Sequence, residues 1–265
     1  MIEKIISGGE TGTDQAALDA AIKWQIPHGG WTPKGRLTES GKLPDKYQLQ
    51  EMPTKSYAAR TEQNVIDSNG TLIISHGPLS EGSKYTHQMA IKHKRPCLHI
   101  DLNKKHDFDA AKQVYQWITK HGIEILNVAG PRASKDPYIY QATMSLIIAV
   151  LHFDLINSVM PQPHKARPFM PQTVDSAVEF LISKIQLKDR VKIANMQESD
   201  LIYLHLTLGS YIRETFGIYL GNEVLMRSCK KILGRSNISE DEVSNVIIRE
   251  LWKRLHKTHA LRIVK

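Results

Sequence analysis

The sequence contains few cysteines and no long apolar run. Only Cys97 and Cys229 occur among 265 residues, and they lie in different halves of the chain. Two distant thiols argue against a disulfide framework and against a cysteine-based zinc site. The apolar stretch from Met144 to Leu151 is shorter than the roughly 20 residues that a membrane-spanning helix needs. Because no apolar leader follows Met1, we expect a soluble, cytoplasmic protein with no membrane partner.

Several common catalytic and binding motifs are also absent. No Gly-Lys-Ser/Thr follows the first glycine-rich loop, which excludes a Walker A site, and no G-x-G-x-x-G points to NAD. A covalent hydrolase has no support, because there is neither a G-x-S-x-G elbow nor an evident Cys–His pair. The 12 histidines lack metal-ligand spacing, so the sequence predicts no metal site.

The chain has a basic balance and the composition of a globular protein. Its formal net charge is +8, and 41% of its residues are hydrophobic. A basic protein concentrates anions around it, so phosphates, other oxyanions and nucleic acid are favoured partners. Nucleic acid is the weakest of these, since the sequence has no dense Lys/Arg run and no basic stripe interleaved with aromatic residues.

Apolar runs bounded by glycine alternate with helical patterns through the first half of the chain. A short strand over 2–6 precedes a helix that starts at Thr13, which we expect to be its cap. A long irregular stretch follows over 28–52. The remaining pattern predicts strands over 71–75, 97–101 and 124–128 and helices over 57–67, 83–94, 107–120 and 137–153. Such alternation predicts an α/β, Rossmann-like fold, a mainly parallel sheet with helices on both faces.

The second half of the chain has a different character. Residues 159–171 are rich in proline and predict a linker between a Rossmann-like domain over 1–158 and an all-helical domain over 172–265. Every apolar pattern beyond the linker is helical, and Ser239 to Glu242 has the spacing of a capping box. We expect the helical domain to contact a protein partner or to support oligomerisation.

Three glycine-rich loops carry the main signal for function, and each follows a predicted strand. They span 7–14, 77–86 and 127–132. Loops at the carboxyl ends of parallel strands share one edge of the sheet, and a helix start beside glycine amides favours an anion. The alternative for each loop is a tight strand–helix turn without a ligand; one glycine loop alone would be a weak signal, whereas three at the same edge favour binding. The predicted ligand-binding residues in these loops are Gly8, Gly9, Thr11, Gly12, Gly82, Ser83, Thr86 and Gly130.

Charged and polar side chains are available to the same edge. Lys34 and Arg36 lie in the long irregular stretch, and Arg132 lies in the third glycine loop. Arg60 and Asn64 are four residues apart on a helix, so we expect them on one face. Arginine suits bidentate contact with phosphate. Taken singly, each of these residues is better explained as an exposed surface charge, whereas as a set beside glycine-rich loops they fit a binding site equally well.

Two acidic residues accompany the first glycine loop. Glu10 and Asp14 are the candidate catalytic carboxylates if the protein is an enzyme. Asp14 fits equally well as an acidic residue in the first turn of a helix.

Five segments together resemble the molybdenum carrier (molybdenum cofactor carrier) family. They are Ser7–Asp19, His28–Arg36, Tyr57–Ser68, Gly82–Thr86 and Asn127–Arg132. The resemblance covers roughly residues 1–155. It implies a circularly permuted member of the Rossmann-like superfamily of DNA-processing protein A and the Lonely Guy phosphoribohydrolases. It also implies a molybdenum cofactor, pterin phosphate or nucleotide-like ligand, and a homo-oligomer.

One position departs from the family pattern. We expect Gln at position 10 in that family, and this chain has Glu10. A carboxylate at a helix start would repel a phosphate unless it points away or contacts a cation. The region after 172 resembles an uncharacterised helical domain that is found fused to various partners.

These observations leave three hypotheses for function. The leading one is a binding or carrier protein for an anionic phosphorylated small molecule. The second is a nucleotide-processing N-glycosidase in which Glu10 or Asp14 assists hydrolysis. The third is a binder of single-stranded nucleic acid, which predicts strongly salt-dependent affinity.

Overall fold

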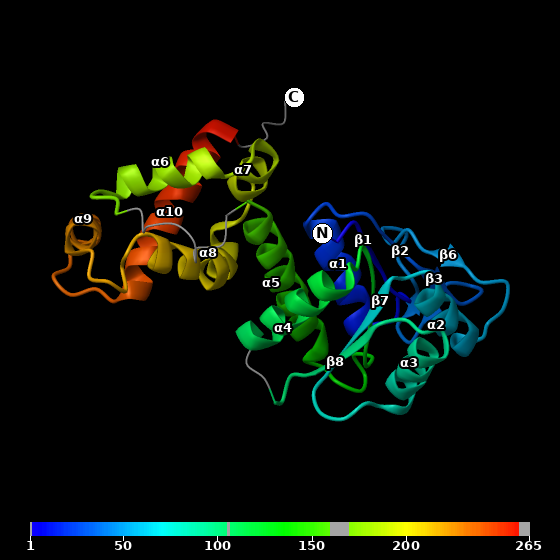
Figure 1. The fold of residues 1–265 in the computed structure, drawn as a ribbon. Coiled ribbons are helices and arrows are strands. Elements are labelled where there is room, and N and C mark those ends of the chain that lie inside the picture. Colours follow the sequence, from blue (N-terminus) through cyan, green and yellow to red (C-terminus); the bar gives the residue numbers. More distant parts are fainter. Residues whose placement is uncertain (1, 105–106, 160–169, 260–265) are drawn as a thin grey trace, which may run out of the picture. The chain divides into compact units, whose positions relative to one another are not determined.

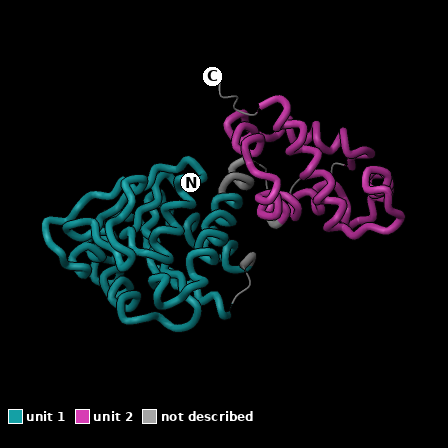
Figure 2. Tube along the Cα trace, turned by 180° about the vertical axis from the view of Figure 1, so that it is seen from behind, with its two compact units in different colours: residues 1–154 teal, residues 155–265 magenta. Residues whose placement is uncertain are grey.

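The chain folds into two compact units, residues 1–154 and 155–265 (Figure 2). The computed structural model describes residues 2–104, 107–159 and 170–259. Among these residues no helix combines the length and the apolar character needed to cross a membrane.

The first unit is built around a five-stranded parallel sheet. Its order is β2-β1-β9-β7-β8, and each neighbouring pair runs parallel. The strands are β1 Lys4–Ile6, β2 His28–Gly29, β7 Gly70–Ser75, β8 Cys97–Asp101 and β9 Ile125–Ala129. Every residue of β7 is buried, as expected for a parallel strand that is covered on both faces.

Helices cover both faces of this sheet (Figure 1). One face carries α1 Thr13–Lys23, α4 Asp107–His121 and α5 Ile139–Val159, and the other carries α2 Tyr57–Ile66 and α3 Glu81–Lys92. The helix α5 packs against both of its neighbours. The ring of Trp24, at the end of α1, lies 4.5 Å from that of His152, and Tyr115 of α4 stacks on Phe153 at 5.7 Å. The predicted α/β, Rossmann-like fold is confirmed.

The stretch over 28–52, expected to be irregular, contains short strands. Besides β2 it holds β3 Trp31–Thr32, β4 Leu37–Thr38, β5 Gly41–Lys42 and β6 Gln50–Glu51. The pair β3 and β6 is parallel, while β4 and β5 form an antiparallel hairpin. Leu43, Tyr47 and Leu49 pack with Leu18 of α1 in one buried cluster. The stretch is therefore fixed on α1 by its apolar side chains.

A single carboxylate adds polar anchors to the same stretch. Asp19 of α1 accepts hydrogen bonds from the Lys46 ammonium at 2.7 Å and the Tyr47 hydroxyl at 2.9 Å. Its Oδ2 also accepts from the Tyr140 hydroxyl of α5 at 2.7 Å. Burial, together with the Asp19 carboxylate, raises the pKa of both tyrosines well above the usual range. The three bonds join α1, α5 and the long stretch.

Two helices start differently from the prediction. The prediction that Thr13 caps α1 is wrong, because the N-cap is Gly12 and no side chain caps that end. Thr13 is the first helical residue, and its hydroxyl donates to the Pro131 carbonyl at 3.2 Å. The helix α3 begins at Glu81 because Ser80 is its N-cap, with Ser80 Oγ accepting from the Ser83 amide at 3.4 Å.

The second unit is helical. Its elements are α6 Val174–Lys184, α7 Leu187–Ala194, the 3-10 turn η2 Glu198–Asp200, α8 Leu201–Thr215, α9 Glu223–Leu233 and α10 Glu240–His259. The helix α10 contacts α6, α7, α8 and α9. It starts with the predicted capping box, since the Glu242 amide donates to Ser239 Oγ at 3.2 Å and the Ser239 amide donates to Glu242 at 2.8 Å. Residues 160–169 of the predicted linker lie outside the described residues.

Candidate functional site

The loops after β1 and β9 pack directly on each other at the carboxyl edge of the sheet. The Thr13 amide donates to the Pro131 carbonyl at 3.2 Å, and the Ala133 amide donates to the Thr11 hydroxyl at 3.3 Å. Two predicted glycines make this approach possible. A Cβ at Gly12 would lie 2.7 Å from the Pro131 oxygen, and one at Gly130 would lie 2.4 Å from the Thr13 hydroxyl. These glycines therefore bring the two loops together.

Arg60 of α2 reaches across the first glycine loop to the start of α1. Its Nη2 lies 3.4 Å from Asp14 Oδ2, and the two side chains are only 12% and 7% exposed. A Cβ at Gly8 would lie 1.8 Å from Arg60 Nη1, so the guanidinium fills the space that the glycine leaves. Burial raises the pKa of Asp14 above its usual value, although the nearby Arg60 opposes the shift.

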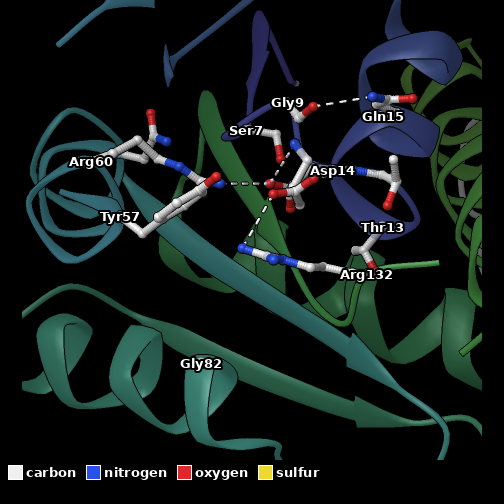
Figure 3. Close-up of polar contacts among 12 residues, drawn as sticks. Ser7, Gly9, Thr13, Asp14, Gln15, Tyr57, Arg60, Gly82 and Arg132 are labelled. Atoms are coloured by element: carbon white, nitrogen blue, oxygen red, sulfur yellow. Dashed lines mark hydrogen bonds and ion pairs between the residues drawn. The ribbon is translucent and has the colours of Figure 1, made fainter. Parts of the chain in front are cut away.

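Arg132, two residues beyond Gly130, meets the other carboxylate of the loop. Its Nη2 lies 3.2 Å from Glu10 Oε2, and its guanidinium lies over the Tyr57 ring, 5.1 Å from the centroid. Figure 3 shows Arg60 and Arg132 pointing toward the carboxylates at the start of α1. The Glu10 carboxylate therefore has a cation partner. A phosphate site next to Glu10 would need such a partner, because an unpaired carboxylate would repel the phosphate. Arg132 keeps 42% of its side chain exposed.

A third carboxylate joins the site from the β4–β5 hairpin. Glu39 accepts hydrogen bonds from the Thr11 hydroxyl, the Ser134 hydroxyl and, at 3.1 Å, the Ser134 amide. Its own amide donates to Glu10 Oε1 at 2.9 Å. Desolvation opposes ionisation here, but the bonds from Ser134 and Thr11 hold the pKa of Glu39 below its usual value. Sequence reasoning missed Glu39 and Ser134.

We call the three carboxylates and two guanidinium groups the glycine-loop cluster, defined by Glu10, Asp14, Glu39, Arg60 and Arg132. Glu10 and Asp14 face arginines, while Glu39 is held by hydroxyl and amide donors. Within the described part of the chain, no group of three or more His, Cys, Asp or Glu side chains is arranged to hold a metal ion. The cluster offers guanidinium groups to an anion and carboxylates for acid–base work.

Three predicted ligand-binding residues, Lys34, Arg36 and Asn64, do not join the glycine-loop cluster. Arg36 and Asn64 instead form hydrogen bonds with backbone groups. Lys34 is exposed. The Arg36 guanidinium donates to the Leu49 carbonyl at 2.8 Å and the Tyr47 carbonyl at 2.9 Å, so it holds its own loop. Asn64 accepts from the Trp31 amide at 2.8 Å and donates to the Trp31 carbonyl at 3.3 Å. Arg60 and Asn64 lie on the same helix, but Arg60 contacts Asp14 whereas Asn64 binds the backbone of Trp31.

The remaining predicted residues lie near the start of α3 or line the first loop. Ser83 Oγ accepts from Ser80 at 3.1 Å, and Thr86 donates to the Gly82 carbonyl at 3.1 Å. Figure 3 draws Gly82 on this separate segment. Gly9 has a φ of +81°, and a Cβ there would lie 2.9 Å from Leu43. Gly9 therefore lets the long stretch pack on the loop.

The second unit has a hollow of its own. It measures about 460 Å³ and is lined by apolar side chains such as Ile202, Ile232 and Val246. Charged side chains also line it, among them Glu198 and Arg249, whose Oε1 and Nε are 3.4 Å apart. None of the predicted ligand-binding residues lines this hollow.

Comparison with known proteins gives a family match in each half of the chain. Residues 170–255 match a domain of unknown function, DUF6794. The first unit's fold also occurs in the crystal structure of a Putative molybdenum carrier protein from Syntrophus aciditrophicus SB, at 61% sequence identity and a TM-score of 0.56. That match covers 57% of this chain and 95% of the other. No curated protein matches the chain. Residues 5–151 match the Circularly permutated YpsA SLOG family, and the chain therefore belongs to that family.

Proposed function

We propose that the first unit binds an anionic phosphorylated small molecule, a pterin phosphate such as molybdenum cofactor or a nucleotide-like compound. One observation carries the proposal. Two arginines from different elements, Arg60 of α2 and Arg132 after β9, converge on a glycine-rich loop at the start of a helix. Guanidinium groups and a helix start both favour phosphate. The exposed part of Arg132 makes it the first contact for such a ligand.

The internal ion pairs are compatible with this role. A buried guanidinium without a partner is costly, so Asp14 holds the nearly buried Arg60 in place when no ligand is bound, and Glu10 pairs with the partly exposed Arg132. The Syntrophus protein carries the name Putative molybdenum carrier protein, and this likeness supports a carrier role for this chain. Molybdenum cofactor would be cargo, and a cargo that brings its own metal ligands needs only phosphate and ring contacts from the protein.

The proposal is tested by titrating the full chain with adenosine 5′-monophosphate and with a pterin phosphate in a calorimeter. Arg132→Ala removes a charge-assisted hydrogen bond, which is worth about 1.5–3 kcal/mol, so affinity falls roughly 10- to 150-fold. Arg235→Ala is the matched control, because Arg235 forms an exposed ion pair with Glu242 in the second unit. It leaves affinity unchanged. Failure of the unaltered protein to bind any phosphorylated compound would refute the proposal.

A second candidate, an N-glycosidase acting on nucleoside monophosphates, rests on the two buried carboxylates. Glu10 lies in the first glycine loop and Asp14 in the first turn of α1, and the raised pKa of Asp14 suits a proton donor. The assay measures free base released from nucleoside monophosphates. Turnover that disappears in Glu10→Gln and persists in Glu3→Gln, a change at an exposed position, supports the enzyme. Absence of turnover in the unaltered protein rules it out.

A further inference from the structure

The Glu39 carboxylate is bound the way a ligand is bound. It stands at the turn of the β4–β5 hairpin, and its partners belong to the loops after β1 and β9. Those partners are the Thr11 hydroxyl, the Ser134 amide and the Ser134 hydroxyl, and all of them donate. The Thr11 oxygen already accepts from the Ala133 amide at 3.3 Å, which directs the Thr11 proton toward Glu39. A set of donors alone is what an oxyanion requires.

The charges of the cluster show what Glu39 does there. With Glu39 in place, three carboxylates share the cluster with only two guanidinium groups. A phosphate that approaches this arrangement meets a surplus of negative charge. Once Glu39 leaves, two carboxylates balance two guanidinium groups and three donors become available. These donors can therefore accept a ligand's anion in exchange for the Glu39 carboxylate.

The hairpin turn is built so that this exchange need not disturb the fold. Glu39 and Ser40 are exposed. Gly41 has a φ of +103°, and a Cβ added there would meet no other atom within 4 Å. The chain is fixed on both sides of the turn. Arg36, before the turn, donates to two loop carbonyls, and Leu43, after it, is buried. Segments with few buried contacts open at low cost, whereas packed anchors stay in place. The turn can move while its base remains attached to α1.

We propose that Thr11, Ser134 and Arg132 form the subsite for a ligand's phosphate, and that Glu39 occupies this subsite until the ligand displaces it. The inference rests on the proposed function and adds a ligand class to it. Glu10 Oε2 is buried and is paired with the Arg132 guanidinium 3.2 Å away, so Glu10 holds Arg132 beside the subsite. The subsite offers only hydrogen-bond donors and a guanidinium, so the ligand class is one with a terminal phosphate, such as a phosphate monoester.

The first test measures binding of inorganic phosphate and adenosine 5′-monophosphate to the full chain and to Glu39→Ala. An internal ligand that fills its subsite nine-tenths of the time weakens apparent affinity about ten-fold. We therefore expect Glu39→Ala to bind both probes about ten-fold more tightly. Glu51→Ala is the matched control, since Glu51 is an exposed acid of the same stretch whose carboxylate accepts from the Gly35 amide. It leaves the affinity as it was.

A second measurement follows the hairpin itself. The Glu39 amide is protected by its bond to Glu10, so hydrogen exchange in peptides covering 37–43 reports displacement. Saturating phosphate speeds exchange of these amides in the unaltered protein, and Glu39→Ala exchanges fast from the start. Adding Ser134→Ala to Glu39→Ala removes one donor and reverses the gain in affinity.

The possible results separate this inference from the proposed function. Equal affinities in the unaltered protein and Glu39→Ala, together with a loss in Arg132→Ala, overturn the subsite and leave the proposed function standing. Unchanged exchange over 37–43 in a protein saturated with phosphate likewise overturns the displacement. If neither the unaltered protein nor Glu39→Ala binds either probe, the inference and the proposed function fall together.

Discussion

Replacing Arg60 by methionine tests how the cluster is held together. The change keeps most of the side-chain length and removes the guanidinium that lies 3.4 Å from Asp14. Both side chains are nearly buried, so the variant leaves a buried carboxylate without its cation. Breaking such a pair costs 3–5 kcal/mol, and the rather long contact favours the lower end, about 3 kcal/mol. For a chain of this size that corresponds to roughly 6–12 °C in Tm.

The loss depends on pH in a direction that the structure fixes. Burial already raises the pKa of Asp14, and removing Arg60 takes away the charge that lowers it. The folded variant then binds a proton that the unfolded chain releases, so its stability rises as the pH falls through the raised pKa. The deficit is therefore greatest at neutral pH. It shrinks as the pH approaches the ordinary aspartate value of 3.8.

Urea unfolding of the full chain at several pH values measures this deficit. The double variant Arg60→Met with Asp14→Asn removes the charge as well as its partner, and we expect it to be more stable than Arg60→Met alone at neutral pH. A loss below about 1 kcal/mol, the size expected of an exposed pair, would refute the reasoning. So would a loss that is the same at every pH.

Three further substitutions and one labelling experiment probe the surroundings. Gly8→Ala pushes the Arg60 guanidinium aside and lowers stability by about 1–3 kcal/mol in urea unfolding, whereas Gly82→Ala, with open space around it, raises stability by about 0.5–1 kcal/mol. Asp19→Ala removes the acceptor of three donors and costs about 2 kcal/mol, with faster proteolysis over 36–50. Burial raises the pKa of Cys97 to about 11, so iodoacetamide at pH 7.5 labels it only after unfolding, as mass spectrometry will show.

The sheet and its helices could be predicted because their signal is local. The strand Cys97–Asp101 was predicted at its observed bounds, and the other main strands fall within two residues of theirs, since each is an apolar run beside glycine or a turn. The strands of two residues over 28–52 could not be predicted, because such short elements have no periodicity. Their position depends on Leu43, Tyr47 and Leu49 meeting Leu18, a contact between distant parts of the chain.

For the candidate site too, residues with a local sequence signal could be predicted, whereas residues that depend on contacts between distant parts of the chain could not. Arg132 was singled out because it lies in a glycine-rich loop, and Arg60 because it shares a helix face with Asn64; the structure places both beside the start of α1. Arg36 was singled out for its charge, but its partners are backbone carbonyls that only the folded loop brings near. Glu39 and Ser134 were missed, because exposed polar residues in loops carry no pattern until the fold joins a hairpin to a distant turn. Oligomeric assembly and a protein partner for the helical unit stay predictions.

The most direct test of the account is what the protein carries when it is purified without added ligand. Mass spectrometry and metal analysis of the unaltered chain, Arg132→Ala and Arg235→Ala would identify and quantify any bound compound. The account predicts a phosphorylated pterin or nucleotide in the unaltered chain and in Arg235→Ala, and its loss from Arg132→Ala. The same bound compound in equal amount in Arg132→Ala would contradict a phosphate site at the glycine-loop cluster.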